Sequence, residues 1–475
     1  MLEAKMYIDG QWVEARSGQR LTTVNPSTGE ALGTVPSGAP EDVDVAVRAA
    51  RRSFGAWSSQ PQGARSDALC KVADALRARA GELAELETLE HGTPQADAMG
   101  MVMGAAAKFE WSAHAAHRIM GTQIPVEGST LSYLQRHPSG VAGFIIPWNL
   151  PTIMAAVKLA PALAVGNTCV LKPASINSLI GLKLAEIIHD AGVLPPGAVN
   201  FVTGPGGSVG GAIATHEEVD IVGFTGSSET GKSLLVAAAA TVKKCVMELG
   251  GNNPVLLYPD ADVDAALDVL AYRQYNNSGQ HCSGPGRYYI HERIYDEFTE
   301  KMRQRAEAVV MGDPRDATVN MGPVVSAEHQ RHVLAHIEDA VAEGARIVTG
   351  GQAQRPGFFV QPTVVADVRH EMRIAREEVF GPVAVLIKYT DADDLVTMAN
   401  GSRYGLCAHV WTRDLAKGMG LIEKLQAGAF FLNTQMLTDE QSWGTSVKES
   451  GIGKEGGNTG MLEFTDQKLV CIKYA

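Results

Sequence analysis

Five short apolar runs recur between residues 140 and 249, and each of the first four is followed by a polar or glycine-rich loop and then by a helical pattern. The five runs are 140–146, 168–171, 199–202, 221–224 and 242–249. Parallel strands need a crossover long enough to hold a helix, so this alternation predicts a parallel sheet covered by helices. Ligands of such sheets bind at the carboxyl ends of the strands, where these loops would lie. The pattern therefore predicts a nucleotide-binding lobe.

A second series of strand and helix patterns follows residue 252. The predicted strands are 255–258, 287–291, 345–348 and 383–389, and the predicted helices are 262–275, 294–310, 327–343 and 391–401. A chain of 475 residues is too long for one ordinary hydrophobic core. The fold class is therefore α/β, with two α/β lobes.

The remaining segments are helical or extended. The helical patterns cover 40–92 and 95–120, the extended pieces are 6–14, 124–138 and 467–474, and residues 25–30 form a turn between short strands. Asp9 and Gly10 are typical of a hairpin turn within the first of these pieces. A strand at 467–474 with no following helix would leave unpaired backbone groups at an edge, which favours pairing with another chain.

Composition and cysteine spacing narrow the function classes and the compartment. The formal charge of −12 and the lack of a lysine- or arginine-rich run argue against binding to nucleic acid or to an anionic membrane. The N-terminus has no apolar core of signal-peptide length, and no apolar stretch is long enough to span a bilayer. Six cysteines are scattered, without the close pairs of a zinc knuckle or a CxxC motif. We therefore expect a cytoplasmic protein without a metal.

A single thiol, Cys282, lies among small and turn-forming residues in the segment 275–286. Three glycines and a proline there disfavour regular structure and let backbone N–H groups approach a ligand. Upstream, Glu248 ends an apolar run just before two glycines. A nucleophile that forms a covalent intermediate needs a nearby base to complete turnover. We interpret Cys282 as the nucleophile and Glu248 as the base, whereas these two segments alone leave open a loop cysteine and a surface glutamate.

Residues 226–233 match the phosphate-loop pattern GxxxxGK[ST] between a strand and a helix, which is the context that the pattern requires. A P-loop NTPase is therefore a rival interpretation. Two features oppose it: four other strand-end loops also suit a ligand, and no apolar strand ends in an aspartate well placed for Mg²⁺. The weaker interpretation is that the N-terminus of this helix binds a pyrophosphate through its free N–H groups.

Two further patterns are interpreted without a function. Residues 451–456 match GxGxxG but do not follow a strand, so we expect a loop there. Three histidines share one face of the helix predicted at 327–343, at a spacing seen in metal-binding helices: His329, His332 and His336. The apolar stripe expected on the opposite, buried face is Leu334, Ile337 and Val341. We expect the histidines to face water, and their face lacks a carboxylate at zinc-binding spacing.

Together these segments resemble the aldehyde dehydrogenase superfamily. The resemblance runs in register over nearly the whole chain, from the turn at Asn25 and Pro26 to the tail. Seven short blocks carry it, and their combination is highly specific. The blocks are residues 147–151 (PWNLP), 171–173 (LKP), 224–227 (FTGS), 248–251 (ELGG), 279–282 (GQHC), 377–382 (EEVFGP) and 450–453 (SGIG).

The resemblance implies a reaction and the residues that carry it out. Cys282 would attack the aldehyde carbon as a thiolate, and the Asn149 amide with the Cys282 backbone N–H would hold the negative oxygen that forms. Loss of hydride to a nicotinamide would leave a thioester, and Glu248 would activate the water that hydrolyses it. Family members that pass the acyl group to coenzyme A typically lack this glutamate, so the implied product is a free carboxylic acid.

The resemblance also implies a nicotinamide dinucleotide as cofactor. Lys172 would bind the adenosine ribose and Glu378 the nicotinamide ribose, with Phe380 packing beside it. The other implied cofactor contacts are Ile146, Trp148, Gly206, Gly226, Ser227 and Leu249. Members resembling strict NAD enzymes often carry a glutamate three residues after the lysine, where this chain has Ser175, which leaves space for a 2′-phosphate and removes a repelling charge. We therefore expect NADP⁺ to be accepted and favoured over NAD⁺.

The substrate is less constrained than the chemistry. Residues 442–446 replace the Pro-Phe-Gly-Gly block common in the family, beside the segment 433–441 that helps to line the substrate mouth in relatives. The candidate pocket residues by family position are Trp111, His114, Leu150, Ile153, His281, Ser283 and Trp443. This set is largely apolar and aromatic and includes no arginine clearly placed to hold a carboxylate. We therefore expect a neutral or aromatic aldehyde, and a semialdehyde with an acidic group is the alternative.

The resemblance divides the chain into three parts and implies two Rossmann-like lobes with a small β excursion. Residues 1–120 and 139–250 would form the dinucleotide-binding domain, residues 251–448 the catalytic domain, and residues 121–138 with 449–475 the oligomerisation segments. Relatives assemble through the excursion and the C-terminal strand, so we expect a homodimer or a homotetramer.

Overall fold

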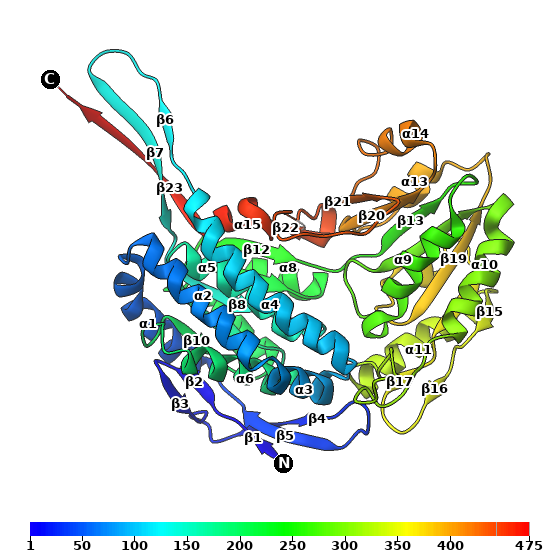
Figure 1. Ribbon diagram of the computed structural model, residues 1–475, viewed down its shortest axis with the longest axis horizontal. Coiled ribbons are helices and arrows are strands. Elements are labelled where there is room, and N and C mark those ends of the chain that lie inside the picture. Colours follow the sequence, from blue (N-terminus) through cyan, green and yellow to red (C-terminus); the bar gives the residue numbers. More distant parts are fainter. Residues whose placement is uncertain (443, 475) are drawn as a thin grey trace.

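The computed structural model describes residues 1–442 and 444–474, which form two α/β lobes and a projecting arm (Figure 1). The parallel strands of the first lobe are β8 (Val141–Ile145), β9 (Thr168–Lys172), β10 (Val199–Phe201), β11 (Ile221–Thr225) and β12 (Lys244–Glu248). The antiparallel edge strands are β2 (Met6–Ile8), β3 (Gln11–Val13) and β22 (Gly451–Ile452). The order across the sheet is β22-β12-β11-β8-β9-β10-β2-β3. The five apolar runs and the first hairpin are thus confirmed as strands.

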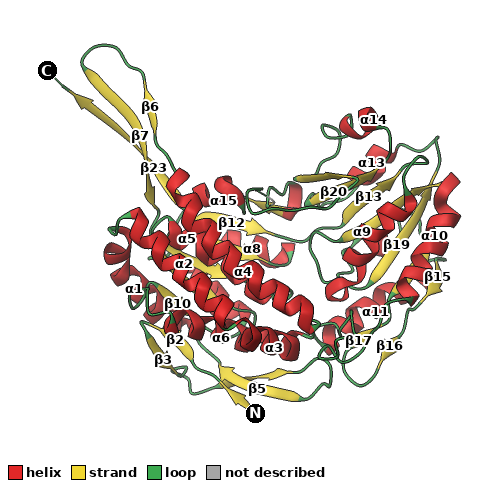
Figure 2. Ribbon diagram, in the orientation of Figure 1, coloured by secondary structure: helices red, strands yellow, loops and turns green. Residues whose placement is uncertain are grey.

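Helices cover both faces of this sheet (Figure 2). On one face lie α1 (Pro40–Ser58), α7 (Gly211–Thr215) and α8 (Ser228–Ala239). On the other lie α5 (Pro151–Ala164) and α6 (Ser178–Asp190), packed against α2 (Gln62–Ala78), α3 (Ala80–His91) and α4 (Gln95–Ala115). Because the central strands are buried on both faces, their runs are continuously apolar instead of alternating. A small sheet of β1 (Leu2–Glu3), β4 (Arg20–Val24) and β5 (Ala31–Pro36) completes this lobe.

The second lobe is built on a seven-stranded sheet. Its strands are β13 (Asn253–Leu257), β14 (Pro285–His291), β15 (Arg346–Thr349), β18 (Thr363–Ala366), β19 (Val383–Tyr389), β20 (Cys407–Trp411) and β21 (Ala429–Leu432). They lie in the order β15-β18-β19-β14-β13-β20-β21, with only the edge strand β15 antiparallel. The sequence predicted β13, β14, β15 and β19 but missed β18, β20 and β21, whose short runs are not separated by a long helical pattern.

Helices and a short hairpin complete the second lobe. The helices are α9 (Val263–Tyr275), α10 (Glu292–Glu307), α11 (Ala327–Ala342), α12 (Arg373–Arg376), α13 (Leu395–Asn400) and α14 (Leu415–Met419). The hairpin pairs β16 (Ala353–Gln354) with β17 (Phe359–Val360). Apolar residues of α9 and α10 form one core with the sheet, and those of α11 form a second.

An arm of three strands projects from the first lobe and carries the C-terminus (Figure 1). It consists of β6 (Thr122–Ile124), β7 (Thr130–Pro138) and β23 (Thr465–Lys473), with β7 in the centre. All nine residues of β23 pair antiparallel with β7. The predicted excursion and final strand are therefore one sheet. Within the described residues, no helix is both long and apolar enough to cross a membrane.

Two expectations from the sequence are wrong. The segment 451–456 is not only a loop, because Gly451 and Ile452 form β22 and pair with Glu248 and Met247 of β12. The first turn of α15 (Gly457–Glu463) follows it directly.

The histidines of α11 do not all face water. His336 is buried beside Val333 and Ile337, and the Nε2 of His329 lies 2.7 Å from the carbonyl oxygen of Phe380. Val341, which was assigned to the buried stripe, is instead 46% exposed. His332 is exposed, as expected, whereas His329 and His336 turn inward, because an amphipathic side chain can bury its ring while its nitrogens reach a polar partner.

Candidate active site

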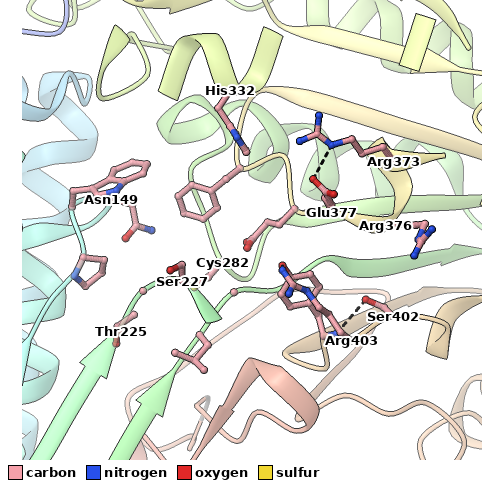
Figure 3. A pocket seen from close by; sticks show the side chains of 18 of the residues that line it. Asn149, Thr225, Ser227, Cys282, His332, Arg373, Arg376, Glu377, Ser402 and Arg403 are labelled. Carbon is pink, nitrogen blue, oxygen red and sulfur yellow. Dashed lines mark hydrogen bonds and ion pairs between the residues drawn. The ribbon is translucent and has the colours of Figure 1, made fainter. Parts of the chain in front are cut away.

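A cavity of about 860 Å³ lies between the two lobes, at the carboxyl ends of the parallel strands of the first sheet. Side chains reach it from both lobes (Figure 3). Those labelled in the figure include Asn149, Thr225 and Ser227 from the first lobe and Cys282, His332, Arg373 and Arg403 from the second. The cavity is thus where the sequence predicted a ligand.

A strained turn holds Cys282 in this cavity. Residues 277–279, just after α9, adopt left-handed φ values of 51°, 55° and 70°. A Cβ atom on Gly279 would lie 2.2 Å from the carbonyl oxygen of Gly381, so only glycine fits this close approach. The Nδ2 of Asn253 donates hydrogen bonds to the carbonyl oxygens of Cys282 and Gly284, at 2.8 and 2.7 Å. Backbone strain and buried hydrogen bonds together fix the position of the thiol.

Asn149 lies against the turn that carries Cys282. It immediately precedes the helix-starting segment Leu150–Pro151, and its Nδ2 donates to the carbonyl oxygen of Gln280 at 2.9 Å. The Nδ2 of Asn277 in turn donates to the backbone carbonyl of Asn149, also at 2.9 Å. A side-chain amide carries two N–H groups, so one remains for an oxygen in the cavity.

Glu248 ends β12 and is buried next to the cavity wall formed by Leu249 and Gly250. Its Oε2 accepts a hydrogen bond from the Ser446 hydroxyl at 3.4 Å, and its Oε1 has no hydrogen-bond partner among the described residues. Burial raises the pKa of Glu248 well above its ordinary value, and the negative charge of Glu455 raises it further. A carboxyl group with this pKa is suited to act as a base near neutral pH.

Lys158 and Glu455 form a buried ion pair that sequence analysis did not find. The Lys158 Nζ lies 2.5 Å from Glu455 Oε1, and the two side chains are 0% and 2% exposed. Lys158 lowers the pKa of Glu248 while Glu455 raises it, so the pair tunes the base. A lysine inside the apolar helix α5 was the only signal in the sequence, and nothing there names its partner 297 residues away.

The thiol of Cys282 is held in its neutral form by its surroundings. Burial raises its pKa to about 12, and the carboxyl groups of Glu378 and Glu248 contribute to that rise. The Ser283 backbone N–H and the guanidinium of Arg273 act in the opposite direction. The nucleophile therefore depends on nearby positive charge or on transfer of its proton to a base.

Six of the ten predicted cofactor contacts line the cavity: Trp148, Gly226, Ser227, Leu249, Glu378 and Phe380. The other four do not line the cavity. They lie at or just after the carboxyl ends of β8, β9 and β10: Ile146, Lys172, Ser175 and Gly206. Lys172 is buried with its Nζ donating to the Pro173 carbonyl at 2.9 Å, and burial lowers its pKa to about 8. The Ser175 hydroxyl donates to the Gly204 carbonyl at 2.7 Å.

Glu378 carries an unsatisfied acceptor at the cavity. Burial raises its pKa to about 8, and its Oε1 has no hydrogen-bond partner among the described residues. Phe380, two residues on, meets the Trp148 ring edge-on at 5.4 Å. Buried polar atoms in native proteins are normally satisfied, so this oxygen suits a hydroxyl group of a ligand. The same cavity wall includes His332, whose side chain is exposed, as the sequence predicted.

The P-loop interpretation does not suit the local geometry. Helix α8 begins at Ser228, so most of the residues 226–233 are inside the helix instead of forming a wide loop. The Gly231 N–H is bonded to the Ser227 carbonyl, and Lys232 pairs with Glu449 at 2.8 Å. What remains is the N-terminus of α8 beside Gly226, where the Ser227 hydroxyl accepts from the Thr230 N–H at 3.3 Å and the first turn suits a pyrophosphate.

The predicted substrate residues lie on several elements. Among the described residues, Leu150 is the pocket candidate that lines this cavity. The Nε2 of His281 lies 3.0 Å from Asn276 Oδ1, and burial lowers the pKa of His281 to about 3. The others are Trp111 and the exposed His114 on α4 and the partly buried Ile153 on α5. Trp443 lies outside the described residues.

An arginine lies closer to the cysteine than the sequence indicated. The Nη2 of Arg273, at the end of α9, lies 3.4 Å from the Ser283 hydroxyl, and Ser283 directly follows Cys282. Sequence analysis had found no arginine clearly placed near the substrate, because no local pattern orients a side chain from the last turn of a helix towards a loop ten residues away.

Comparisons with known proteins agree with the geometry. The model of the aldehyde dehydrogenase family matches residues 12–470. A mitochondrial aldehyde dehydrogenase of Leishmania tarentolae is 40% identical over 99% of this chain and 95% of its own. The putative aldehyde dehydrogenase DhaS of Bacillus subtilis is 40% identical over 98% of this chain and 95% of its own.

Solved structures share the whole architecture. An NADP-dependent enzyme of E. coli superposes with a TM-score of 0.97 at 36% identity, covering 99% of this chain and 98% of that one. The betaine aldehyde dehydrogenase of Staphylococcus aureus in complex with NAD⁺ gives a TM-score of 0.95 at 34% identity, covering 99% and 95%. The chain therefore belongs to the aldehyde dehydrogenase family, as an NAD(P)-dependent enzyme.

Proposed function

We propose that this enzyme oxidises a neutral or aromatic aldehyde to the free carboxylic acid through a thioester on Cys282. The observation that carries the proposal is that Cys282 and Asn149 line one cavity and that the buried carboxyl group of Glu248 directly precedes Leu249 in its wall. Nucleophile, oxyanion donor and base are the three groups that acyl transfer to water requires. The unpaired oxygen of Glu378 and the N-terminus of α8 suit the ribose and the pyrophosphate of a nicotinamide dinucleotide.

In the first half of the reaction, the Cys282 sulfur bonds to the carbonyl carbon and the carbonyl oxygen becomes negative. The free N–H of Asn149 and the Cys282 backbone N–H hold this oxygen. The bound nicotinamide supplies the chemistry of a hydride acceptor. When the hydride leaves the carbon, the carbon–oxygen double bond reforms and a thioester remains on Cys282.

In the second half, Glu248 removes a proton from water while the water oxygen bonds to the thioester carbon. The bond between that carbon and the Cys282 sulfur then breaks, which releases the carboxylic acid and restores the thiolate. The buried ion pair of Lys158 and Glu455 acts on the pKa of Glu248 during this proton transfer: Lys158 lowers it and Glu455 raises it.

The test separates the two halves. In Glu248→Gln we expect a rapid burst of reduced cofactor, followed by turnover slower by about 100-fold or more, because the general base is lost. Mass spectrometry should find the acyl group on Cys282. Glu297→Gln, at an exposed position of α10, serves as the control and should turn over normally. Undiminished oxidation by Cys282→Ser would refute the proposal.

The substrate class has its own test. The leucine, tryptophan and isoleucine at the predicted pocket positions favour apolar side chains on the aldehyde. We expect kcat/KM to be higher for benzaldehyde and hexanal than for succinic semialdehyde. A higher value for the acidic semialdehyde would establish the alternative substrate class instead.

We further propose that NADP⁺ is preferred, because Ser175 places no negative charge at the end of β9 and Lys172 lies nearby. In Ser175→Glu we expect kcat/KM for NADP⁺ to fall about tenfold or more while the value for NAD⁺ is kept, since a carboxylate would repel the 2′-phosphate. A wild-type enzyme with far lower kcat/KM for NADP⁺ than for NAD⁺ would contradict this proposal.

Assembly and compartment are proposed on separate grounds. The exposed edge of β23 supports a homodimer or homotetramer, because an unpaired edge strand favours a further strand. All six cysteines are free, which supports a reducing, cytoplasmic compartment.

A further inference from the structure

Arg273 is a partly buried cation beside the loop that carries Cys282. Its Nη2 lies 3.4 Å from the Ser283 hydroxyl. Its Nε is enclosed and has no hydrogen-bond partner among residues 1–442 and 444–474. A guanidinium normally uses its five N–H donors, and one that leaves a donor unsatisfied in the interior is held there at a cost in stability.

The position of Arg273 relative to the cysteine loop is fixed by other contacts of Ser283. The Nε2 of Gln435 donates to the Ser283 carbonyl at 2.9 Å, and the Cys407 sulfur lies 3.6 Å from the same oxygen. The loop therefore cannot move away from the guanidinium without breaking these contacts.

No carboxylate pairs with Arg273 in the part of the chain that the structure describes. The titratable groups that it faces are Cys282, Cys407, Tyr272, His281 and His409. The two histidines do not repel it near neutral pH, because burial lowers the pKa of each to about 3. Buried cations are usually paired with an anion, so the anion that Arg273 faces is a thiolate or one from outside the chain.

The thiol of Cys282, in turn, needs a nearby cation to ionise. Its charged neighbours on the cofactor side are the carboxyl groups of Glu378 and Glu248, which oppose ionisation, and Arg273 is the one side-chain cation that favours it among the described residues. Cys407 is buried at the start of β20, away from the cavity lining, so Cys282 is the thiol that meets substrate.

We propose that Arg273 is a positioning residue that stabilises the thiolate of Cys282 and sets the pH range in which the nucleophile forms. The guanidinium acts across Ser283 without touching substrate. On ionisation the thiol proton leaves for water, and the charge on sulfur is compensated by Arg273. The proposal rests on Cys282 being the nucleophile, but its test measures the thiolate directly and does not need turnover.

The test is the pH dependence of Cys282 alkylation by iodoacetamide in the enzyme without cofactor, followed on the Cys282 peptide by mass spectrometry. In Arg273→Gln we expect the midpoint to move up by about one pH unit, because a nearby cation is removed. Arg273→Lys keeps the charge and should restore most of the wild-type profile. Arg305→Gln, an exposed arginine on α10 of the same lobe, is the matched control and should not move it.

A second variant keeps the proposal testable should Arg273→Gln fail to fold. Gln435→Glu removes the amide that donates to the Ser283 carbonyl and adds a negative charge near Arg273, so it should also move the alkylation midpoint upward. An unchanged midpoint in a folded Arg273→Gln or in Gln435→Glu would overturn the proposal. So would a loss confined to the KM of acidic aldehydes, which would assign Arg273 to a substrate carboxylate. Failure of the proposed reaction would instead appear as full activity in Cys282→Ser.

Discussion

At the scale of single residues, the enzyme buries ionisable groups where their charge state matters. Glu248, Glu378 and Cys282 all have a raised pKa because of burial, and few cations compensate them. Burying such groups lowers the stability of the fold, but at functional sites it shifts the pKa of acids and bases towards the working pH.

The first prediction concerns the base. In the proposed mechanism Glu248 must be ionised to activate water, so kcat for a substrate limited by thioester hydrolysis should rise with pH through the raised pKa of Glu248. Lys158→Met removes the cation that lowers this pKa, so the rise should occur at higher pH. The variant should also lose about 3–5 kcal/mol of stability, because Glu455 is left buried without its partner. Lys301→Met, at the surface of α10, is the control. A pH profile of kcat in Lys158→Met that matches the wild type would contradict an effect of Lys158 on the pKa of Glu248.

The second prediction concerns acid stability. His91 is fully buried, and burial lowers its pKa to about 3 from an ordinary 6.5. The folded state therefore binds fewer protons than the unfolded state between these values, so stability falls as pH drops below 6.5. Between pH 7 and pH 5 the wild type should lose about 2 kcal/mol more than His91→Gln, measured by urea unfolding. The exposed His114→Gln is the control, and equal losses in His91→Gln and wild type would refute the assignment.

At the scale of elements, the catalytic loop is shaped by a backbone approach between two segments of the second lobe. Gly279 has a φ of 70°, and a Cβ there would lie 2.2 Å from the Gly381 carbonyl. Gly279 and Gly381 belong to the loops that carry Cys282 and Glu378, so this contact sets the distance between the proposed nucleophile and the proposed cofactor contact.

The third prediction follows from that approach. Gly279→Ala should lower stability by about 2 kcal/mol or more through backbone strain. It should lower kcat by about 100-fold, since the thiol would move by roughly 1 Å from its productive position. Gly55→Ala in α1 has open space around its Cβ and should be neutral or stabilising by about 0.5–1 kcal/mol. Thermal melting and steady-state kinetics measure both effects, and a fully active Gly279→Ala would show that the loop tolerates the side chain.

At the scale of the whole molecule, the arm is the part that the chain does not cover by itself. Leu469 and Ile472 on β23 are 59% and 46% exposed, which is unusual for large aliphatic side chains on a strand. The arm extends away from both lobes, so neither lobe covers this surface (Figure 1).

The fourth prediction concerns assembly. The double variant Leu469→Lys and Ile472→Lys should have a smaller mass by light scattering than the wild type, because charged side chains disfavour packing of the exposed strand. Lys468→Gln on the same strand should leave the mass unchanged. A monomeric wild-type enzyme would contradict the proposal of an oligomer.

The sequence by itself determined most of the elements and the reaction class, although it missed β18, β20 and β21. The strand-end loops of the first lobe, the irregular segment 275–286 with Cys282, and Glu248 at the end of a strand are local patterns, which depend on propensity and spacing. The tertiary structure alone decided which distant groups tune that chemistry. It brought Lys158 to Glu455 across 297 residues, placed Arg273 beside Ser283, turned His336 inward and paired Gly451 with Glu248. Charge–charge interactions and burial act through space, and spatial neighbours are set by packing, which no local pattern encodes.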